Sequence, residues 1–99
     1  MIIVHDTFVC KPGQASKMAK LMKEWAEIKP KKNTYVMTDQ TGQFHRVLIA
    51  TNYDSVTAYE EETKNMMANQ TPEEKILMEK FKDMNEMYVS GGREIYKVW

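Results

Sequence analysis

The chain contains a single cysteine, carries no net charge and has no long apolar run. Cys10 alone excludes an internal disulfide and favours a reducing compartment, by default the cytoplasm. Fourteen basic and fourteen acidic residues cancel, so no overall field attracts nucleic acid or an anionic membrane. Apolar runs are too short for a membrane-spanning helix, and the start MIIVHD lacks the basic and apolar blocks of a signal peptide.

The remaining composition is that of an ordinary globular domain, with 42% hydrophobic and 28% charged residues. Because a chain of 99 residues buries enough surface for one core but not two, we expect a single domain over residues 1–99. The nine methionines could mark a copper site or an adaptable pocket, or they could fill the core. Met18 and Met22 lie one helical turn apart, which favours core filling.

The sequence pattern predicts four strands and three helical segments. β-branched and aromatic residues predict strands over residues 2–10, 33–39, 44–53 and about 88–98. Apolar residues spaced as i, i+3, i+4 and i+7 predict a helix over residues 14–29. Two further helices are expected, one after Asp54-Ser55 and one after Thr71.

Local signals mark the ends of these elements. Thr71 is a typical N-cap, Pro72 suits the first helical position, and Glu74 would complete a capping box. This helix would carry Leu77, Phe81 and Met84 on one face, and Tyr88 as well if it extends that far. The preceding helix, capped by Asp54-Ser55, would turn Val56, Tyr59, Thr63 and then Met66 or Met67 inward. Gly91-Gly92 suggests a bulge or bend in the last strand, and residues 40–43 a hairpin connection.

The element order β-α-β-β-α-α-β predicts an α+β fold. With the second helical region counted as one broken element, this is the ferredoxin-like, split βαβ plan. We therefore expect a four-stranded antiparallel sheet of order 4-1-3-2, with the helices on one face.

The two central strands of this sheet are apolar on both sides. Ile2, Val4 and Phe8 alternate with Ile3 and Val9 in the first strand, and the third strand alternates in the same way. Helices can cover only one face, and monomers rarely expose an apolar patch of several hundred Å². The pattern therefore predicts a homodimer that pairs through the open sheet face.

Three segments carry a resemblance to a known family: the opening strand that runs into Lys11-Pro12-Gly13 and a helix, the segment FHRVLIATNYDS, and the closing GGREIYKVW. In these the chain resembles the dimeric α+β barrel superfamily. It is similar to its small stand-alone members, which are the antibiotic-biosynthesis-type monooxygenases, the haem-degrading monooxygenases and the NIPSNAP-like proteins. The resemblance implies a dimeric α+β barrel with a pocket inside each subunit, between sheet and helices.

The same resemblance disfavours haem degradation. The haem-degrading members use an asparagine late in the first strand, a tryptophan in the helix after the third strand, and a histidine further along as the iron ligand. By position, Asp6 and Tyr59 stand where the asparagine and the tryptophan are expected, and no histidine follows His45. We therefore expect neither haem nor another cofactor.

Asp6 is the first candidate for chemistry. It shares a strand face with Val4 and Phe8, the face assigned to the helices, where a carboxylate is costly unless it is paired or protonated. It could therefore act as a general base, or it could simply bond a lysine or backbone amides near the end of the sheet.

Other candidates follow from the same faces. Tyr59 would assist Asp6, and Phe8, Trp25 and Tyr88 would shape a pocket for a planar substrate; as helix-face aromatics several of these could equally be plain core. Charged residues such as Arg93 could anchor an acidic substrate or lie solvated at the rim. His5 points to the opposite face, and no HxxxH motif or Cys/His cluster indicates a metal site.

Two functions remain open from the sequence. The first is a cofactor-free monooxygenase-like enzyme acting on a small aromatic or polyketide-like molecule, with Asp6 as the base. The alternative is a non-catalytic module that binds a small ligand or another protein. Nucleic-acid binding is disfavoured, because the net charge is zero and no stripe of aromatic and basic residues marks a free sheet face.

Overall fold

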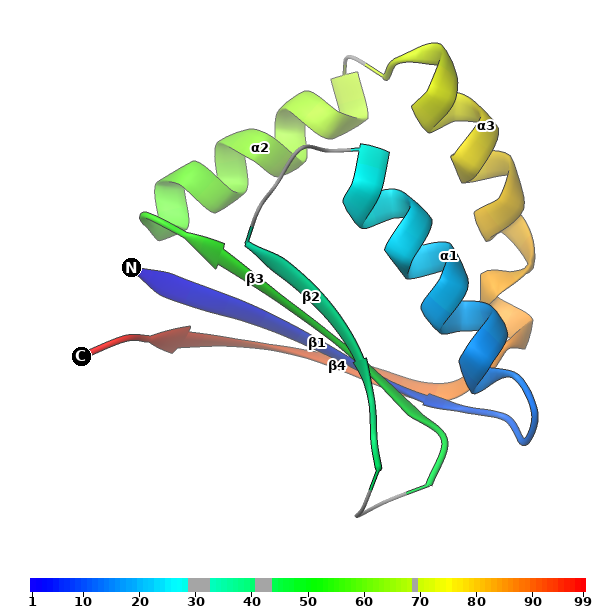
Figure 1. Cartoon of the computed structure of the whole chain (residues 1–99). Helices are drawn as coiled ribbons and strands as arrows, with labels where there is room; N and C mark the ends of the chain where they lie inside the picture. Colours follow the sequence, from blue (N-terminus) through cyan, green and yellow to red (C-terminus); the bar gives the residue numbers. More distant parts are fainter. Residues whose placement is uncertain (29–32, 41–43, 69) are drawn as a thin grey trace.

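The computed structural model describes residues 1–28, 33–40, 44–68 and 70–99. Three helices and a short 3-10 helix lie on one face of a four-stranded sheet (Figure 1). In chain order the elements are β1 (Ile2–Cys10), α1 (Ala15–Ile28), β2 (Thr34–Thr38), β3 (Arg46–Tyr53), α2 (Val56–Ala68), α3 (Pro72–Lys80), the 3-10 helix η1 (Phe81–Glu86) and β4 (Tyr88–Lys97).

The sheet has the strand order β2-β3-β1-β4, and each neighbouring pair is antiparallel. This confirms the predicted α+β, ferredoxin-like plan and its order 4-1-3-2. In the register, Asp6 lies opposite Ile49 of β3 and opposite Arg93 of β4. Because side chains alternate between the faces of a strand, these three residues point to the same side, toward the helices.

The core lies between α1 and the centre of the sheet. Met18 and Val47 have no exposed surface, and Cys10 and Met22 are buried beside them. The Cys10 thiol donates to the Met18 sulfur at 3.3 Å. Methionine is therefore used as a core residue here, as the helical spacing of Met18 and Met22 predicted.

The predicted helix caps are formed, with one difference. The Ser55 hydroxyl accepts from the Ala58 backbone N–H at 3.1 Å, and the Thr71 hydroxyl accepts from the Glu74 N–H at 3.2 Å. A capping box would also require the Glu74 carboxylate to accept a hydrogen bond from the Thr71 backbone N–H. This bond is not among the hydrogen bonds of the described residues, and the buried Oε2 atom of Glu74 has no partner there. The Glu74 side chain is instead drawn inward, since the residue is only 7% exposed.

Three further sequence predictions are wrong in detail. Val56 was expected to face inward but is 45% exposed. The third strand begins at Arg46 and not at residue 44, because His45 has a φ of 64° and lies in a turn, a conformation that extended strands do not contain. The last helix ends at Lys80 and continues as η1.

The bulge in β4 lies beside the glycines and not at them. Gly91 and Gly92 pair regularly with Phe8 and Thr7, and the register shifts only between Val9 and Cys10. Gly91 serves a different purpose, since a Cβ atom there would lie 3.2 Å from the Phe8 ring. The hairpin connection predicted at 40–43 falls mostly outside the described residues.

The face of the sheet opposite the helices is uncovered (Figure 1). Strand alternation places Tyr35, Met37 and Tyr96 on this face, where they are 60%, 41% and 48% exposed. Leu48 and Ala50 lie between them on β3. We refer to these five residues together with Ile3, His5, Thr7 and Val9 of β1 as the open face. Among the described helices, none is both long and apolar enough to cross a membrane.

Candidate functional site

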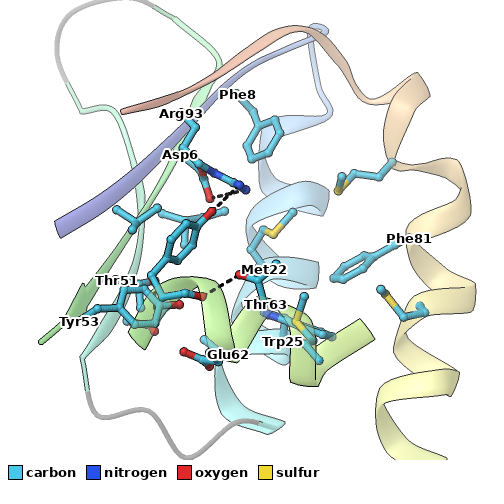
Figure 2. A pocket seen from close by; sticks show the side chains of 18 residues that line it. Asp6, Phe8, Met22, Trp25, Thr51, Tyr53, Glu62, Thr63, Phe81 and Arg93 are labelled. Atoms are coloured by element: carbon cyan, nitrogen blue, oxygen red, sulfur yellow. Dashed lines mark hydrogen bonds and ion pairs between the residues drawn. The ribbon is translucent and has the colours of Figure 1, made fainter. Parts of the chain in front are cut away.

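A cavity of about 320 Å³ lies between the sheet and the helix layer (Figure 2). Ligand pockets in proteins begin at roughly this size. Asp6, Phe8, Trp25 and Tyr59, all predicted as site residues, line this cavity. Tyr88, the fifth predicted residue, is not among the residues that line it. It packs behind Phe8, with ring centroids 5.1 Å apart, and its hydroxyl donates to Asn85.

Most of the cavity wall is apolar and comes from the helices. The rings of Trp25 and Phe81 lie 5.8 Å apart on the side away from the sheet. Four methionines complete this side: Met22, Met66, Met78 and Met84. Flexible thioether side chains beside aromatic rings make a wall that can adapt to the shape of a ligand. The methionines thus serve both the core and the pocket.

Charged and hydroxyl groups gather at the other end of the cavity. The Arg93 Nε atom donates to Asp6 Oδ1 at 2.6 Å, and Nη2 lies 3.5 Å from Oδ2. Arg93 Nη1 donates to the Tyr59 hydroxyl at 2.6 Å. Figure 2 shows the side chains of Asp6 and Arg93 directed toward one another at this end, with Phe8 beside them. The antiparallel pairing of β1 with β4 sets Asp6 opposite Arg93 and so creates this contact.

The pair is only partly shielded from water. The Asp6 side chain is 21% exposed and the Arg93 side chain 56% exposed. The hydrogen bond to Asp6 raises the pKa of Arg93 above its ordinary value, although burial opposes the shift. Arg93 is therefore a fixed cation that Asp6 neutralises.

Tyr53 stands next to this cluster, at the end of β3. Its ring meets the edge of the Tyr59 ring at a centroid distance of 5.2 Å. Burial raises the pKa of Tyr53 above 10.0, and the nearby Tyr59 and Asp6 raise it further, while Arg93 acts against them. Tyr53 therefore keeps its proton at neutral pH and can serve as a hydrogen-bond donor.

A second polar group lies on α2. Glu62 and Thr63 line the cavity, and the Thr63 hydroxyl donates to the Tyr59 carbonyl at 3.0 Å. On the sheet side, the Thr34 hydroxyl donates to the Thr51 hydroxyl at 3.4 Å. The cavity thus combines an adaptable apolar wall with polar groups at defined positions, as small-molecule sites usually do.

Neither histidine belongs to the cavity. His5 lies on the open face, where its ring meets Tyr96 at 6.2 Å, and His45 sits in the turn before β3. Within the described ranges, no group of three or more His, Cys, Asp or Glu side chains is placed to hold a metal ion.

Sequence reasoning missed several pocket residues. Tyr53 and Glu62 were not predicted as site residues, and the partner of Asp6 was not identified. The strand register carries the missing signal: pairing residue 6 with residue 93 becomes visible once β1 and β4 are aligned from their bulge. Glu62 lies one residue from the predicted inward position Thr63, within the width of a helix face.

No protein-family model matches this chain, and no curated protein matches it. Several solved structures, however, superpose well on this chain. A NIPSNAP family protein of unknown function from Agrobacterium tumefaciens superposes with a TM-score of 0.77 at 17% identity, over 99% of this chain and 87% of the other. A NIPSNAP-like domain protein from Burkholderia xenovorans gives a TM-score of 0.76 at 14% identity, over 99% and 84%.

Proteins named for monooxygenase activity share the fold as well. A candidate antibiotic biosynthesis monooxygenase from Deinococcus radiodurans superposes with a TM-score of 0.67 at 17% identity, over 100% of this chain and 93% of the other. The resemblance to NIPSNAP-like and antibiotic-biosynthesis-monooxygenase-like proteins is therefore confirmed at the level of the fold.

Proposed function

We propose that this protein is a small-molecule enzyme of the cofactor-free monooxygenase type, acting on a small aromatic or polyketide-like molecule. The observation that carries the proposal is a carboxylate, Asp6, at the polar end of a cavity with a largely apolar wall, beside a cation and two phenol groups. Structural similarity to a candidate antibiotic biosynthesis monooxygenase supports the reaction class.

In this proposal the protein supplies proton transfer and anion stabilisation. Asp6 takes a proton from an acidic C–H or O–H group of the substrate and becomes neutral. The Arg93 guanidinium then pairs with the resulting substrate anion in place of Asp6. Tyr53 and Tyr59, which line the same cavity, would donate hydrogen bonds to the same oxygen. The electron-rich anion then reacts with O₂. A CH₂ group becomes a carbonyl, one oxygen atom enters the product, and the other leaves as water.

The apolar wall would hold the rings of the substrate. Trp25, Phe81 and Phe8 offer aromatic surfaces for stacking, and the methionines allow ring systems of different outline. Binding at this wall would orient the acidic group toward Asp6.

The test is oxygen consumption with a panel of phenols, quinols and anthrones. We expect Asp6→Asn to abolish turnover of any active compound, because the amide cannot accept the proton. The matched control is Asp39→Asn, which removes the carboxylate of another Asp-Arg pair, Asp39 with Arg46, that does not line the cavity. Full activity in Asp6→Asn would contradict the assigned base.

One observation favours the alternative, a non-catalytic ligand-binding protein. Arg93 holds Asp6 at 2.6 Å, and a carboxylate in such an ion pair must leave its partner before it can accept a proton from a substrate. In this case the panel would bind to the wild-type protein but would not be consumed. Calorimetry beside the oxygen measurement separates the two functions.

We also propose that two copies pair through the open face. Tyr35, Met37 and Tyr96 expose large apolar side chains there, and a two-fold axis would bring the same surface of each copy together. The N- and C-termini lie beside each other at one end of the sheet (Figure 1). The proposed setting for this dimer is the cytoplasm.

A further inference from the structure

Arg93 is the only cation among the described residues that line the cavity. Asp6 already neutralises it, through Nε at 2.6 Å and Nη2 at 3.5 Å. Nη1 is engaged by Tyr59. The guanidinium at the polar end is therefore already paired with Asp6 and Tyr59 before any ligand binds.

We infer that Asp6 determines the charge of the ligand: it makes the cavity selective for neutral molecules and excludes those that enter with a negative charge. This inference rests on the proposed function, because it assumes that the cavity binds a small molecule. Asp6 is then a specificity-determining residue in addition to its proposed role as a base.

An anionic ligand has two ways to occupy the polar end, and both are unfavourable. It can displace Asp6 from Arg93, which leaves a carboxylate of 21% exposure without its partner. It can instead lie beside Asp6, which places two negative charges against one guanidinium. Glu62, the third charged residue of the described lining, is also a carboxylate, so it cannot pair with an anionic ligand.

A neutral ligand with a weakly acidic hydroxyl does not have to displace Asp6 from Arg93, and it brings no second negative charge next to Asp6. Its O–H can donate to Asp6 while its oxygen accepts from the phenol groups of the cluster. If the hydroxyl ionises in the site, its proton passes to Asp6. The new anion then takes over Arg93, and the total charge of the cluster does not change. A ligand that arrives already ionised brings no proton for Asp6 and cannot use this exchange.

The test compares two probes of the same shape and different charge, 2-naphthoate and 2-naphthamide, by isothermal titration calorimetry at pH 7. For the wild-type protein we expect the amide to bind at least about tenfold more tightly than the carboxylate, because like charges at close range are strongly disfavoured. For Asp6→Asn we expect the order to reverse, since Arg93 is then free to pair with the carboxylate of the probe.

Two further variants make the result specific. Asp39→Asn removes the same charge outside the cavity and should keep the wild-type preference for the amide. The double variant Asp6→Asn/Arg93→Gln should lose the gain in naphthoate binding, because the cation that produced it is gone. Circular dichroism of each variant checks that it is folded, and the comparison of the two probes on the wild-type protein requires no variant.

The outcomes separate this inference from the proposed function. Equal binding of amide and carboxylate to the wild-type protein overturns the charge selectivity and leaves the ligand pocket standing. A folded Asp6→Asn variant that gains no affinity for naphthoate also overturns it. Failure of both probes and of the phenol panel to bind any variant overturns the proposed function, and the inference with it.

Discussion

The two faces of the sheet are built from the same strands but are packed differently: helices cover one face and leave the other open (Figure 1). On the covered face, β1 presents Val4, Asp6 and Phe8 to a helix layer that leaves a cavity above them. On the open face, the alternate residues contact only neighbours within the described sheet, such as His5 against Tyr96, and no described helix packs on them (Figure 1). Apolar residues on both sides of a strand therefore do not make two equivalent cores: one face encloses a cavity, and no described helix covers the other (Figure 1).

The largest expected effect comes from placing a charge on the open face. Leu48→Glu should convert the proposed dimer to a monomer, with a dissociation constant raised at least about a thousandfold, since two unpaired carboxylates would be buried across a two-fold axis. Light scattering at micromolar concentration measures the mass. Ile76→Glu is the control, because Ile76 is 63% exposed on α3 and should leave the mass unchanged. A wild-type monomer would contradict the proposed dimer directly.

The next effect concerns the helix layer of the covered face. Leu77 of α3 is 2% exposed, and Leu77→Ala should lower the free energy of unfolding by about 2–5 kcal/mol through lost contacts and a new void. Ile76→Ala, at the exposed neighbouring position, should change it by less than about 0.5 kcal/mol. Urea denaturation measures both, and equal losses would show that Leu77 does not anchor the layer.

A smaller effect distinguishes the two faces within one strand. In Gly91→Ala the new Cβ would lie 3.2 Å from the Phe8 ring, so this ring, which lines the cavity, must shift, at a cost of about 1 kcal/mol. Gly92 points to the opposite face, and a Cβ there meets nothing within 4 Å, so Gly92→Ala should not destabilise the subunit. Thermal unfolding compares the two, and binding of 2-naphthamide should weaken in Gly91→Ala alone.

The smallest effect is a pH dependence from the covered face. Tyr53 has a pKa raised above 10.0 by burial and by Tyr59 and Asp6. Above pH 10 the unfolded chain therefore loses this proton first, so the contribution of Tyr53 to stability falls as pH rises through the folded pKa. Tyr53→Phe should show a smaller loss of melting temperature between pH 9 and about pH 10.5. An identical loss in both proteins would rule out this contribution.

The fold was predictable because its signals are local or periodic. Strand composition, the helical stripe around Met18 and Met22, and the N-cap at Thr71 each depend on residues close in sequence. Together they leave few possible topologies, and the order 4-1-3-2 follows. The errors occurred where tertiary contacts decide: Gly91 of β4 accommodates the Phe8 ring, and Glu74 is drawn inward.

The site was predictable only in part. Asp6, Phe8, Trp25 and Tyr59 could be placed in one cavity, because their faces follow from strand and helix periodicity. The ion pair with Arg93 could not, since it joins positions 87 residues apart through the pairing of two strands. Periodicity gives the face on which a side chain lies, whereas its partner across the sheet depends on the register.

The burial of Cys10 also makes its thiol a probe of local unfolding, because the thiol can react only when α1 separates from the sheet. The thiol is 3% exposed and hydrogen-bonded to Met18, and burial raises its pKa, so thiol reagents meet no reactive thiolate in the folded state. Because Cys10 is the only cysteine, the rate at which a thiol reagent modifies it records how often α1 separates from the sheet, with no engineered cysteine or tag.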